Sequence, residues 1–598
     1  MRSLIGLASS WIKRACTPSA TPSLLTFLLT RTSMLKRKFD ILGDNLDAQR
    51  RTRARKMPTA TATITLTPQE TKLKNLLLDA AKYVDRSQTN SEPTVLRWAG
   101  GWVRDKLLGI ESHDIDTAIN TMTGEAFALK ICELCQQAEI IERYAITDTD
   151  IGNLHKIASN PEKSKHLETT TAKLFGYDVD FVNLRKETYA DHSRHPQVEF
   201  GTAEEDALRR DATINALFYN LNTDQVEDFT SGLADMKSKL IRTPLEPFQT
   251  FMDDPLRVLR LVRFASRLEF TIDPAAEKVM GDSRVLESLR LKISRERVGV
   301  EVEKMLKGKH PRRALQYIND LGLYHTIFTD PTSTTIPKPD TSNWNLAYEC
   351  LDFLRQNKTP GSIYNVLVGT EETPYYAWLL AAIVPWDSVP VPSQKVSDSA
   401  SQPRKGPNKP PPSLVALAAR EGIKATTKFC NLATAAHNNR EEIMSFKTAV
   451  SEKAAYINER DKVGMAIRRW DSKGGHWRLQ VLYALLVEAM QAWTVGPSTN
   501  SASNDEFLRG WQMFLDHLQE LDVMDAPSLK RLIDGTRLAE ALGVKPGSWM
   551  TRALDVCVAW QLRNPDATDP SGSIHEVYKR RDELGIPATT KNLSTADW

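Results

Sequence analysis

The order of apolar and polar residues divides the chain into two parts of different structure. Between about residues 94 and 230, short β-like runs such as TVLRWA, IDTAI and YDVDFVNL alternate with helical segments. From about residue 253 onward the strand signals almost vanish, and apolar residues recur at three- and four-residue spacing. Helices are predicted there at 255–269, 296–307, 311–321, 343–356, 376–384, 477–494, 506–521 and 550–563. The pattern therefore predicts an α+β architecture: a small mixed sheet followed by a long all-helical region.

Two polar stretches interrupt the helical region. Residues 389–413 are rich in Pro, Ser and Lys and bury too little apolar surface to stay ordered. The shorter run TVGPSTNSASN at 494–504 has the same character. Because 598 residues exceed the size at which one hydrophobic core stops growing, we expect several folding units, with a disordered loop at about 389–413.

Charge changes this picture mainly at the N-terminus. Residues 1–56 hold 12 Lys and Arg against 3 Asp and Glu. The first 39 residues contain no Asp or Glu, but they do contain spaced basic residues and many Ser, Thr and Leu. This composition predicts a mitochondrial transit peptide; a disordered tail without a targeting role is the alternative. A second start at Met34 would retain the basic run QRRTRARK and predicts a cytoplasmic or nuclear form.

The rest of the chain is mildly acidic, so nucleic acid would have to be bound by local patches rather than by a global field. One basic patch is visible in the sequence, at residues 253–313, with 15 basic and 10 acidic side chains. The longest apolar run near the N-terminus, LLTFLL, is too short to span a bilayer, so no membrane contact is expected.

Candidate chemistry begins with two aspartates in the run SHDIDTAI. Asp114 and Asp116 are two residues apart in a β-like segment, so their carboxylates project from the same face of a strand. Such a pair suits Mg²⁺, which prefers oxygen ligands and retains water and phosphate oxygens. By itself this spacing is common in long proteins. Asp178 and Asp180 repeat it and supply a third carboxylate if their strand neighbours the first, although an exposed strand edge explains them equally well.

A glycine pair precedes the aspartates in RWAGGWVRDKLLG. The run predicts a strand, then Gly100 and Gly101, a helix from about Trp102, and a stop at Gly109. Main-chain N–H groups at a helix start attract phosphate, and glycine allows close approach of a ligand. Arg104 adds a guanidinium able to hold two phosphate oxygens. With Mg²⁺ ten or so residues later, the stretch is typical of a triphosphate site, although it is not an ATPase P-loop.

Five motifs in order make the resemblance specific. The motifs are GGWVRD with DID, EEDALRRDATINALFYN (204–220), DFTSGLADM (228–236), DDPLRVLRLVRFASRL (253–268) and ISRERVGVEVEKML (293–306). In this order they resemble the motifs of CCA-adding tRNA nucleotidyltransferases of the eukaryotic and bacterial class, over roughly residues 70–325. A fainter likeness to the helical tail of the eukaryotic members continues at 538–565.

The resemblance implies an architecture. A polymerase-β-like catalytic head would occupy 57–232, a nucleotide-selecting neck 233–325, and a helical body and tail that bind tRNA 326–598. Residues 1–56 would precede the head as transit peptide or disordered basic segment. The motif around Gly232, between Asp228 and Asp235, falls at the head–neck junction, where we expect a hinge without direct chemistry.

The resemblance also implies the reaction. Such enzymes add C, C and A from CTP and ATP to the 3′ end of tRNA without a nucleic-acid template, and release pyrophosphate. Asp114 and Asp116 would hold two Mg²⁺ ions, with Asp180 as the third carboxylate. Arg209, Arg210 and Asp211 would contact the triphosphate and sugar, although two arginines before a helix are usually solvated and Asp211 could cap that helix.

The arginine-rich helix from residue 253 explains how side chains can select a base. Cytosine and adenine both present an amino group beside a ring-nitrogen acceptor, which a carboxylate and a guanidinium side by side can satisfy. Uracil places a carbonyl against the carboxylate and is rejected. Asp254 and Arg257, one helical turn apart, can form this edge. The bland alternative is that Asp254 caps a helix whose first residue is Pro255, with a solvated arginine face.

The resemblance assigns Asp254 and Arg257 to nucleotide selection, and Arg260 and Arg263 to positioning the base or its phosphates. Asp253 stands where the family usually has Glu, which keeps the charge but shortens the reach. Residues 145–176 resemble the family's flexible loop only in position and polarity. Because related enzymes that differ in this loop add only CC, a CC-only or A-only enzyme is the nearest alternative. A poly(A) polymerase and an inactive tRNA-binding protein are the others. The partners would be tRNA, through its 3′ end and acceptor and TΨC region, CTP and ATP, with the chain as monomer or homodimer.

Overall fold

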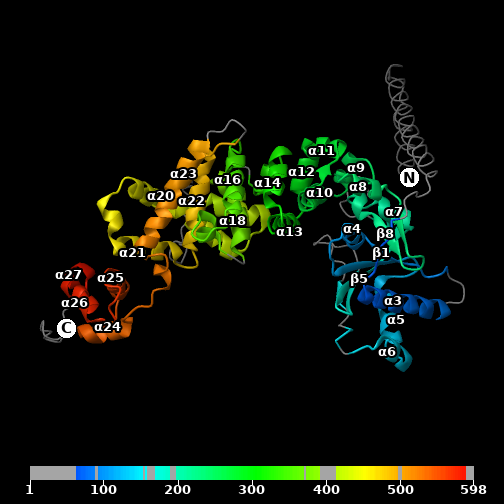
Figure 1. The fold of residues 1–598 in the computed structure, drawn as a ribbon, viewed down its shortest axis with the longest axis horizontal. Coiled ribbons are helices and arrows are strands. Elements are labelled where there is room, and N and C mark those ends of the chain that lie inside the picture. The colour runs from blue at the N-terminus through cyan, green and yellow to red at the C-terminus, as the bar shows by residue number, and fades with distance from the viewer. Residues whose placement is uncertain are drawn as a thin grey trace, which may run out of the picture.

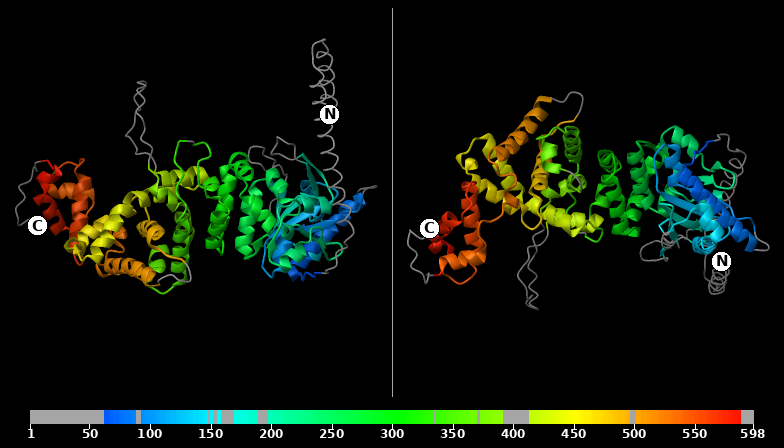
Figure 2. Two further views of the ribbon diagram at one scale, coloured as in Figure 1. Left: turned by 90° about the horizontal axis from the view of Figure 1, so that it is seen from above. Right: turned by 60° about the horizontal axis from the view of Figure 1, so that its bottom comes forward.

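The computed structural model describes residues 62–587 apart from 88–91, 148, 152–154, 158–168, 189–196, 334, 370–371, 391–412 and 496–500. The predicted transit peptide, Met34, most of the predicted loop at 389–413 and part of the segment 145–176 lie outside the described residues. The molecule is elongated, with the sheet at one end and the C-terminal helices at the other (Figure 1). Both views in Figure 2 show the same succession of parts.

The N-terminal part contains a seven-stranded mixed sheet in the order β3-β4-β5-β2-β1-β8-β9. Its strands are β1 (Leu96–Ala99), β2 (Asp114–Ile119), β3 (His155–Ile157), β4 (Thr169–Leu174), β5 (Tyr177–Asn183), β8 (Leu217–Asn220) and β9 (Gln225–Asp228). Only β2 and β5 run parallel; the other neighbours are antiparallel. A separate hairpin joins β6 (Arg185–Thr188) to β7 (Gln197–Phe200).

The two faces of the sheet are covered differently because side chains alternate along each strand. Ile115 and Phe181 face the helices α3 (Pro68–Ser87) and α5 (Gly124–Leu134) and join the main core. On the other face, Ala118 and Phe218 form a small cluster with α7 (Ala203–Leu208). The second face therefore carries a thin apolar layer and leaves the first residues of β2 uncovered.

Short elements connect and flank the strands. They are α4 (Gly101–Leu107), α6 (Ala138–Tyr144), the 3₁₀ turn η2 (Thr213–Asn215), α8 (Gly232–Lys237) and β10 (Leu240–Ile241). The pair β10 and β11 (Thr271–Ile272) ties the end of the sheet domain to the following helices. Gly109 has a positive φ of 70° and ends the α4 segment, as the sequence predicts.

In the described part of the chain after β10, every regular element except the two-residue strand β11 is a helix, which confirms the predicted fold class. The first group comprises α9 (Pro247–Asp253), α10 (Leu256–Leu268), α11 (Pro274–Met280), α12 (Ser283–Lys292), α13 (Arg295–Leu306), α14 (Pro311–Asp320) and α15 (Tyr324–Ile327). The next comprises α16 (Trp344–Gln356), α17 (Ile363–Val368), α18 (Thr373–Ile383), η3 (Val384–Ser388), α19 (Leu414–Leu417), η4 (Ala418–Gly422), α20 (Thr427–Ser451), η5 (Ala455–Asn458), α21 (Arg460–Asp471), α22 (Trp477–Ala492), α23 (Ser501–Glu520) and η6 (Ala526–Ser528).

The C-terminal helices have a core of their own. They are α24 (Gly535–Leu542), α25 (Met550–Arg563), α26 (Ser571–Lys579) and α27 (Arg581–Leu584). Leu538, Ala553 and Val577 are fully buried within it. One core otherwise runs from the sheet through the helical body, and Leu562 joins it by packing on Gly464 of α21. In the described part of the chain, no helix is both long and apolar enough to cross a bilayer.

Candidate active site

Three carboxylates meet on the open face of the sheet, at the start of β2 and β5. In the parallel pairing of these strands, Asp116 lies opposite Asp180 and Asp114 opposite Asp178. Residues at i and i+2, and their register partners on the next strand, share a face. Asp114 and Asp116 are exposed, and Asp180 is half-buried with its Oδ1 accepting a hydrogen bond from Thr171 Oγ1 at 2.5 Å. The predicted neighbouring strand is therefore present.

The surroundings of Asp116 disfavour its charged form. Desolvation by nearby protein atoms raises the pKa of Asp116, and the negative charges of Asp180 and Asp114 raise it further. The guanidinium of Arg210 opposes this shift. A bound cation would relieve the same repulsion. Among the described residues, no group of three His, Cys, Asp or Glu side chains encloses an ion by itself. Water and phosphate oxygens would have to complete the coordination of a hard cation here.

Gly100 brings the main chain against the carboxylates. Ala99 pairs with Asp116 across β1 and β2, and Gly100 N donates to Leu217 O at 3.0 Å. Gly100 has φ +68°, which favours glycine, and a Cβ built on it would lie 2.7 Å from Arg210 Nη1 and 3.8 Å from Asp116 Oδ2. The glycine pair and the aspartate pair, separate in the sequence, thus form one site.

Asp206 fixes both predicted arginines, a role that the sequence reasoning missed. The Nε of Arg209 and that of Arg210 donate to the two different oxygens of this carboxylate, at 2.9 and 3.0 Å. Burial alone would raise the pKa of Asp206, but the two guanidinium groups bring it below its usual value. Arg210 also lies 5.0 Å from the centre of the Phe218 ring. These arginines are therefore rigid and mostly buried rather than solvated.

Asn215 links three of the predicted residues. Its Oδ1 accepts from Arg104 Nη1 at 2.5 Å, its Nδ2 donates to Asp211 Oδ1 at 3.0 Å, and its main-chain O accepts from Arg210 Nη1 at 3.0 Å. The side chain is 7% exposed. A single amide thus holds a guanidinium at one end and a carboxylate at the other. No spacing pattern in the sequence signals this role.

Arg104 and Asp211 are placed differently from the expectations. Arg104 is only 3% exposed and donates through Nε to Asp105 Oδ1 at 2.7 Å, so its guanidinium is committed within the protein in this conformation. The prediction that Asp211 caps a helix is wrong: Ala212 is the N-cap of η2, without a side-chain bond. Burial would raise the pKa of Asp211, but Arg260, whose Nε donates to Oδ2 at 2.5 Å, holds it far below its usual value.

Three arginines of α10 contact the sheet domain or α13. Arg257, 9% exposed, donates through Nη2 to the main-chain O of Arg209 at 2.8 Å. Arg263 Nε donates to Glu301 Oε2 at 2.6 Å, and Arg260 Nη1 lies 3.8 Å from Glu301 Oε1. The solvated arginine face of the alternative is therefore only partly present, because Arg267 remains exposed while its Nη2 lies 3.2 Å from Asp105 Oδ2. Glu301 is a partner that the sequence reasoning did not find.

The helix α10 begins one residue later than predicted. The helix begins at Leu256, with Pro255 rather than Asp254 as N-cap, and Asp254 Oδ1 accepts from Leu256 N at 3.1 Å. Its Oδ2 lies 3.4 Å from Arg297 Nη2, an unpredicted partner. Asp253 accepts a hydrogen bond from Gln249 Nε2 at 2.6 Å, and burial raises its pKa. Asp254 and Arg257 are thus each held by other groups, within one turn of each other.

Comparison with known proteins identifies the class. A family model described as "Poly A polymerase head domain" matches residues 96–242, and one described as "Probable RNA and SrmB- binding site of polymerase A" matches residues 269–333. A solved CCA-adding enzyme, in its apo form II, has the same fold, with a TM-score of 0.56 over 86% of this chain and 96% of that one, at 18% identity. The fold and the carboxylate site together define a nucleotidyltransferase.

Sequence relatives make the assignment narrower. "Nucleotidyltransferase lcsQ" of Purpureocillium lilacinum is 53% identical over 92% of this chain and 98% of its own length. The mitochondrial CCA tRNA nucleotidyltransferase of Saccharomyces cerevisiae is 38% identical over 85% of this chain and 92% of its own length. The chain belongs to the family of CCA-adding tRNA nucleotidyltransferases.

Proposed function

We propose that this enzyme adds C, C and A in turn to the 3′ end of tRNA, using CTP and ATP and releasing pyrophosphate. The observation that carries the proposal is the junction of two sites. Arg210 Nη1 and Asp116 Oδ2 lie 2.7 and 3.8 Å from the position that a Cβ on Gly100 would occupy. Beside them, Arg257 of α10 donates a hydrogen bond to the main-chain O of Arg209. A triphosphate held at the first group would place its base near the N-terminal turn of α10.

The carboxylates supply a site for a hard cation. Asp114, Asp116 and Asp180 would hold Mg²⁺ together with water and phosphate oxygens; when bound, Mg²⁺ activates the terminal ribose hydroxyl and neutralises charge on the triphosphate and leaving pyrophosphate. Asp116 must be deprotonated for this. Arg210, fixed by Asp206, contributes a positive charge that needs no reorganisation during the reaction.

Glycine and the arginine pair would orient the triphosphate. Gly100 and Gly101 leave space above the main chain for phosphate oxygens; α4 has only seven residues, so the charges of Arg209 and Arg210 matter more than its dipole. Asp211, kept ionised by Arg260, is suited to accept a ribose hydroxyl hydrogen. Arg104 is buried against Asn215 and Asp105, and we propose that it supports the site from behind.

Asp254 and Arg257 would form the base-reading edge. Asp254 accepts from the amino group of cytosine or adenine, and Arg257 donates to the adjacent ring nitrogen. Uracil would face the carboxylate with a carbonyl oxygen, leaving two acceptors against each other. Since Arg257 is held by Arg209 O and Asp254 by Leu256 N, the edge is preorganised. Arg260 and Arg263, held by Asp211 and Glu301, would set the position of the helix.

The helical body would bind the tRNA, and a mitochondrial location fits both the N-terminal composition and the names of the yeast relatives. The test is to incubate the full chain and Mg²⁺ with a tRNA lacking its CCA end, supplying CTP, ATP or both, and to size the products. The proposal expects two nucleotides added with CTP alone and three with both. Arrest after two with both nucleotides present would assign the chain to the CC-only class.

A further inference from the structure

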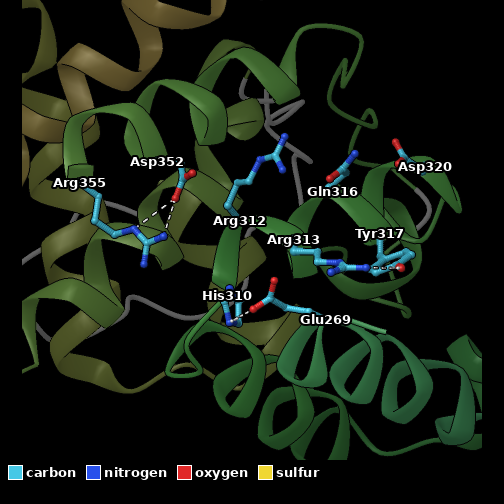
Figure 3. A pocket seen from close by; sticks show the side chains of 9 residues that line it. All are labelled: Glu269, His310, Arg312, Arg313, Gln316, Tyr317, Asp320, Asp352 and Arg355. Atoms are coloured by element: carbon cyan, nitrogen blue, oxygen red, sulfur yellow. Dashed lines mark hydrogen bonds and ion pairs between the residues drawn. The ribbon is translucent and has the colours of Figure 1, made fainter. Parts of the chain in front are cut away.

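A polar pocket lies beyond the C-terminal end of α10, away from the carboxylates. It is a hollow of about 480 Å³ formed mainly by α14 and α16, with Glu269 at its edge (Figure 3). Because α10 has 13 residues, this edge lies roughly 20 Å along the helix from its base-reading end. Arg312 and Arg313, the last two residues of the basic segment 253–313, line the pocket. The residues of this segment that are proposed to contact the nucleotide all lie in its first third.

Most charges around the pocket are paired. Arg355 Nη2 lies 2.7 Å from Asp352 Oδ1, and His310 Nε2 lies 2.9 Å from Glu269 Oε1. Arg312 reaches back to Glu349, with 2.6 Å between Nη2 and Oε1. In the two arginine pairs the opposite charges cancel. The Nη1 of Arg312 makes no bond within the described part of the chain and remains able to donate.

Arg313 is the exception. Its Nη2 donates to the main-chain O of Phe270 at 3.0 Å and to Tyr317 Oη at 3.5 Å, and among the described residues it has no carboxylate partner within ion-pair distance. Its guanidinium carbon lies 5.8 Å from the centre of the Tyr317 ring. A half-buried guanidinium is thus oriented by neutral groups, with its charge uncompensated and its other N–H groups available.

Two further features bear on what the pocket would bind. The first turn of α14, which lines it, begins at Pro311 without a side-chain cap, so the positive end of the helix adds to the field of Arg313. Asp320 is the one lining carboxylate without an ion pair among the described residues, and in Figure 3 its oxygens point away from the Arg313 guanidinium. Arg313 is therefore the lining cation best placed to hold an anion.

We propose that this pocket binds one phosphate of the tRNA backbone, held by Arg313 with help from Arg312 Nη1. The inference rests on tRNA being the substrate. A tRNA whose 3′ end reaches Asp114 must extend away from that residue. A phosphate contact at the far end of α10 would fix the tRNA stem while the growing 3′ end is repositioned after each addition. Phosphate contacts position nucleic acid without reading its sequence.

The test is equilibrium binding of a tRNA lacking CCA to the full chain over a series of NaCl concentrations. A single lost phosphate contact lowers the slope of log K against log salt by about 0.7–0.9. Arg313→Gln should do this and weaken binding about tenfold at low salt, while Arg313→Lys should retain most of the slope. Arg290→Gln is the control for the loss of one positive charge: Arg290 also donates to a main-chain carbonyl, that of Pro331 at 2.7 Å, but it pairs with Glu287 and lies outside the pocket.

An unchanged slope for Arg313→Gln would overturn the proposal, as would an equal fall for Arg290→Gln. Pyrophosphate titrated at constant ionic strength separates a free anion from a backbone phosphate: saturable binding lost in Arg313→Gln, with the tRNA slope intact, would assign the pocket to the free anion. CTP affinity and Tm report whether the variant is folded. Because only binding is measured, the result stands even if the enzyme adds fewer than three nucleotides.

Discussion

Arg257 Nη2 donates a hydrogen bond of 2.8 Å to the main-chain oxygen of Arg209, across 48 residues of sequence. This bond connects the first turn of α10 to the segment that also carries Arg210 and Asp211. A displacement of α10 would therefore also move the groups beside Asp116, so the proposed base-reading and triphosphate sites are coupled through this hydrogen bond.

Gly100→Ala should reduce kcat/KM about 100-fold. The added methyl group would meet Arg210 Nη1, which cannot retreat because Asp206 and Asn215 hold it. Strain from the positive φ should also cost about 1 kcal/mol of unfolding free energy. Gly109→Ala is the control, since Gly109 has φ +70° with open space around its Cβ position. It should lose similar stability and keep its activity; equal activity losses would refute the contact.

Asn215→Leu should weaken discrimination between CTP and dCTP by about tenfold and raise the KM for CTP. The reason is that Asp211, proposed to accept a ribose hydroxyl, loses the amide that orients it. Thr213→Val is the control: it removes a 2.7 Å hydrogen bond from the same 3₁₀ turn to Asp235, which is not among the proposed nucleotide contacts. Comparable loss of ribose discrimination in both variants would show that the effect comes from general loosening of the turn.

Asp116→Asn should abolish addition, by at least about a thousand-fold, yet raise Tm in metal-free buffer at pH 7. Because desolvation and the neighbouring carboxylates raise the pKa of Asp116, its ionised form is less stable in the folded than in the unfolded protein. This destabilisation is absent below the unfolded pKa and complete above the folded one. Scanning calorimetry of both proteins from pH 3 to 7 tests it; a stability difference independent of pH would contradict the assignment, and tRNA affinity should stay unchanged.

Local pattern predicted the fold class and that Asp116 and Asp180 lie on neighbouring strands, but not the hydrogen bonds of the candidate site. Helices with a clear apolar stripe, such as α10 and α25, begin and end within a residue or so of prediction. The longest helix among the described residues, α20, was not predicted, because polar residues such as Asn438, Asn439 and Arg440 interrupt its apolar stripe. Its packing against α22 stabilises it instead, which is a tertiary contact that no local window contains.

The partners of the predicted charged residues could not be predicted from the sequence for the same reason. Asp114, Asp116 and Asp180 followed from strand alternation and from motif order. Glu301 and Arg297, which hold Arg263 and Asp254, lie about 40 residues away on another helix. Only the packing of the helices brings these residues together. The sequence alone is therefore equally consistent with a solvated arginine face.

Nucleotide selectivity of Arg257→Ala tests the central claim most directly. A tRNA lacking CCA is incubated with equal concentrations of CTP, ATP, UTP and GTP, and the added 3′ ends are sequenced for the wild type and the variant. We predict CCA from the wild type, and from the variant a rise of at least about tenfold in U incorporation, because the guanidinium proposed to define the base edge is gone. Unchanged selectivity in a variant that still adds nucleotides would contradict the claim that this helix acts as the template.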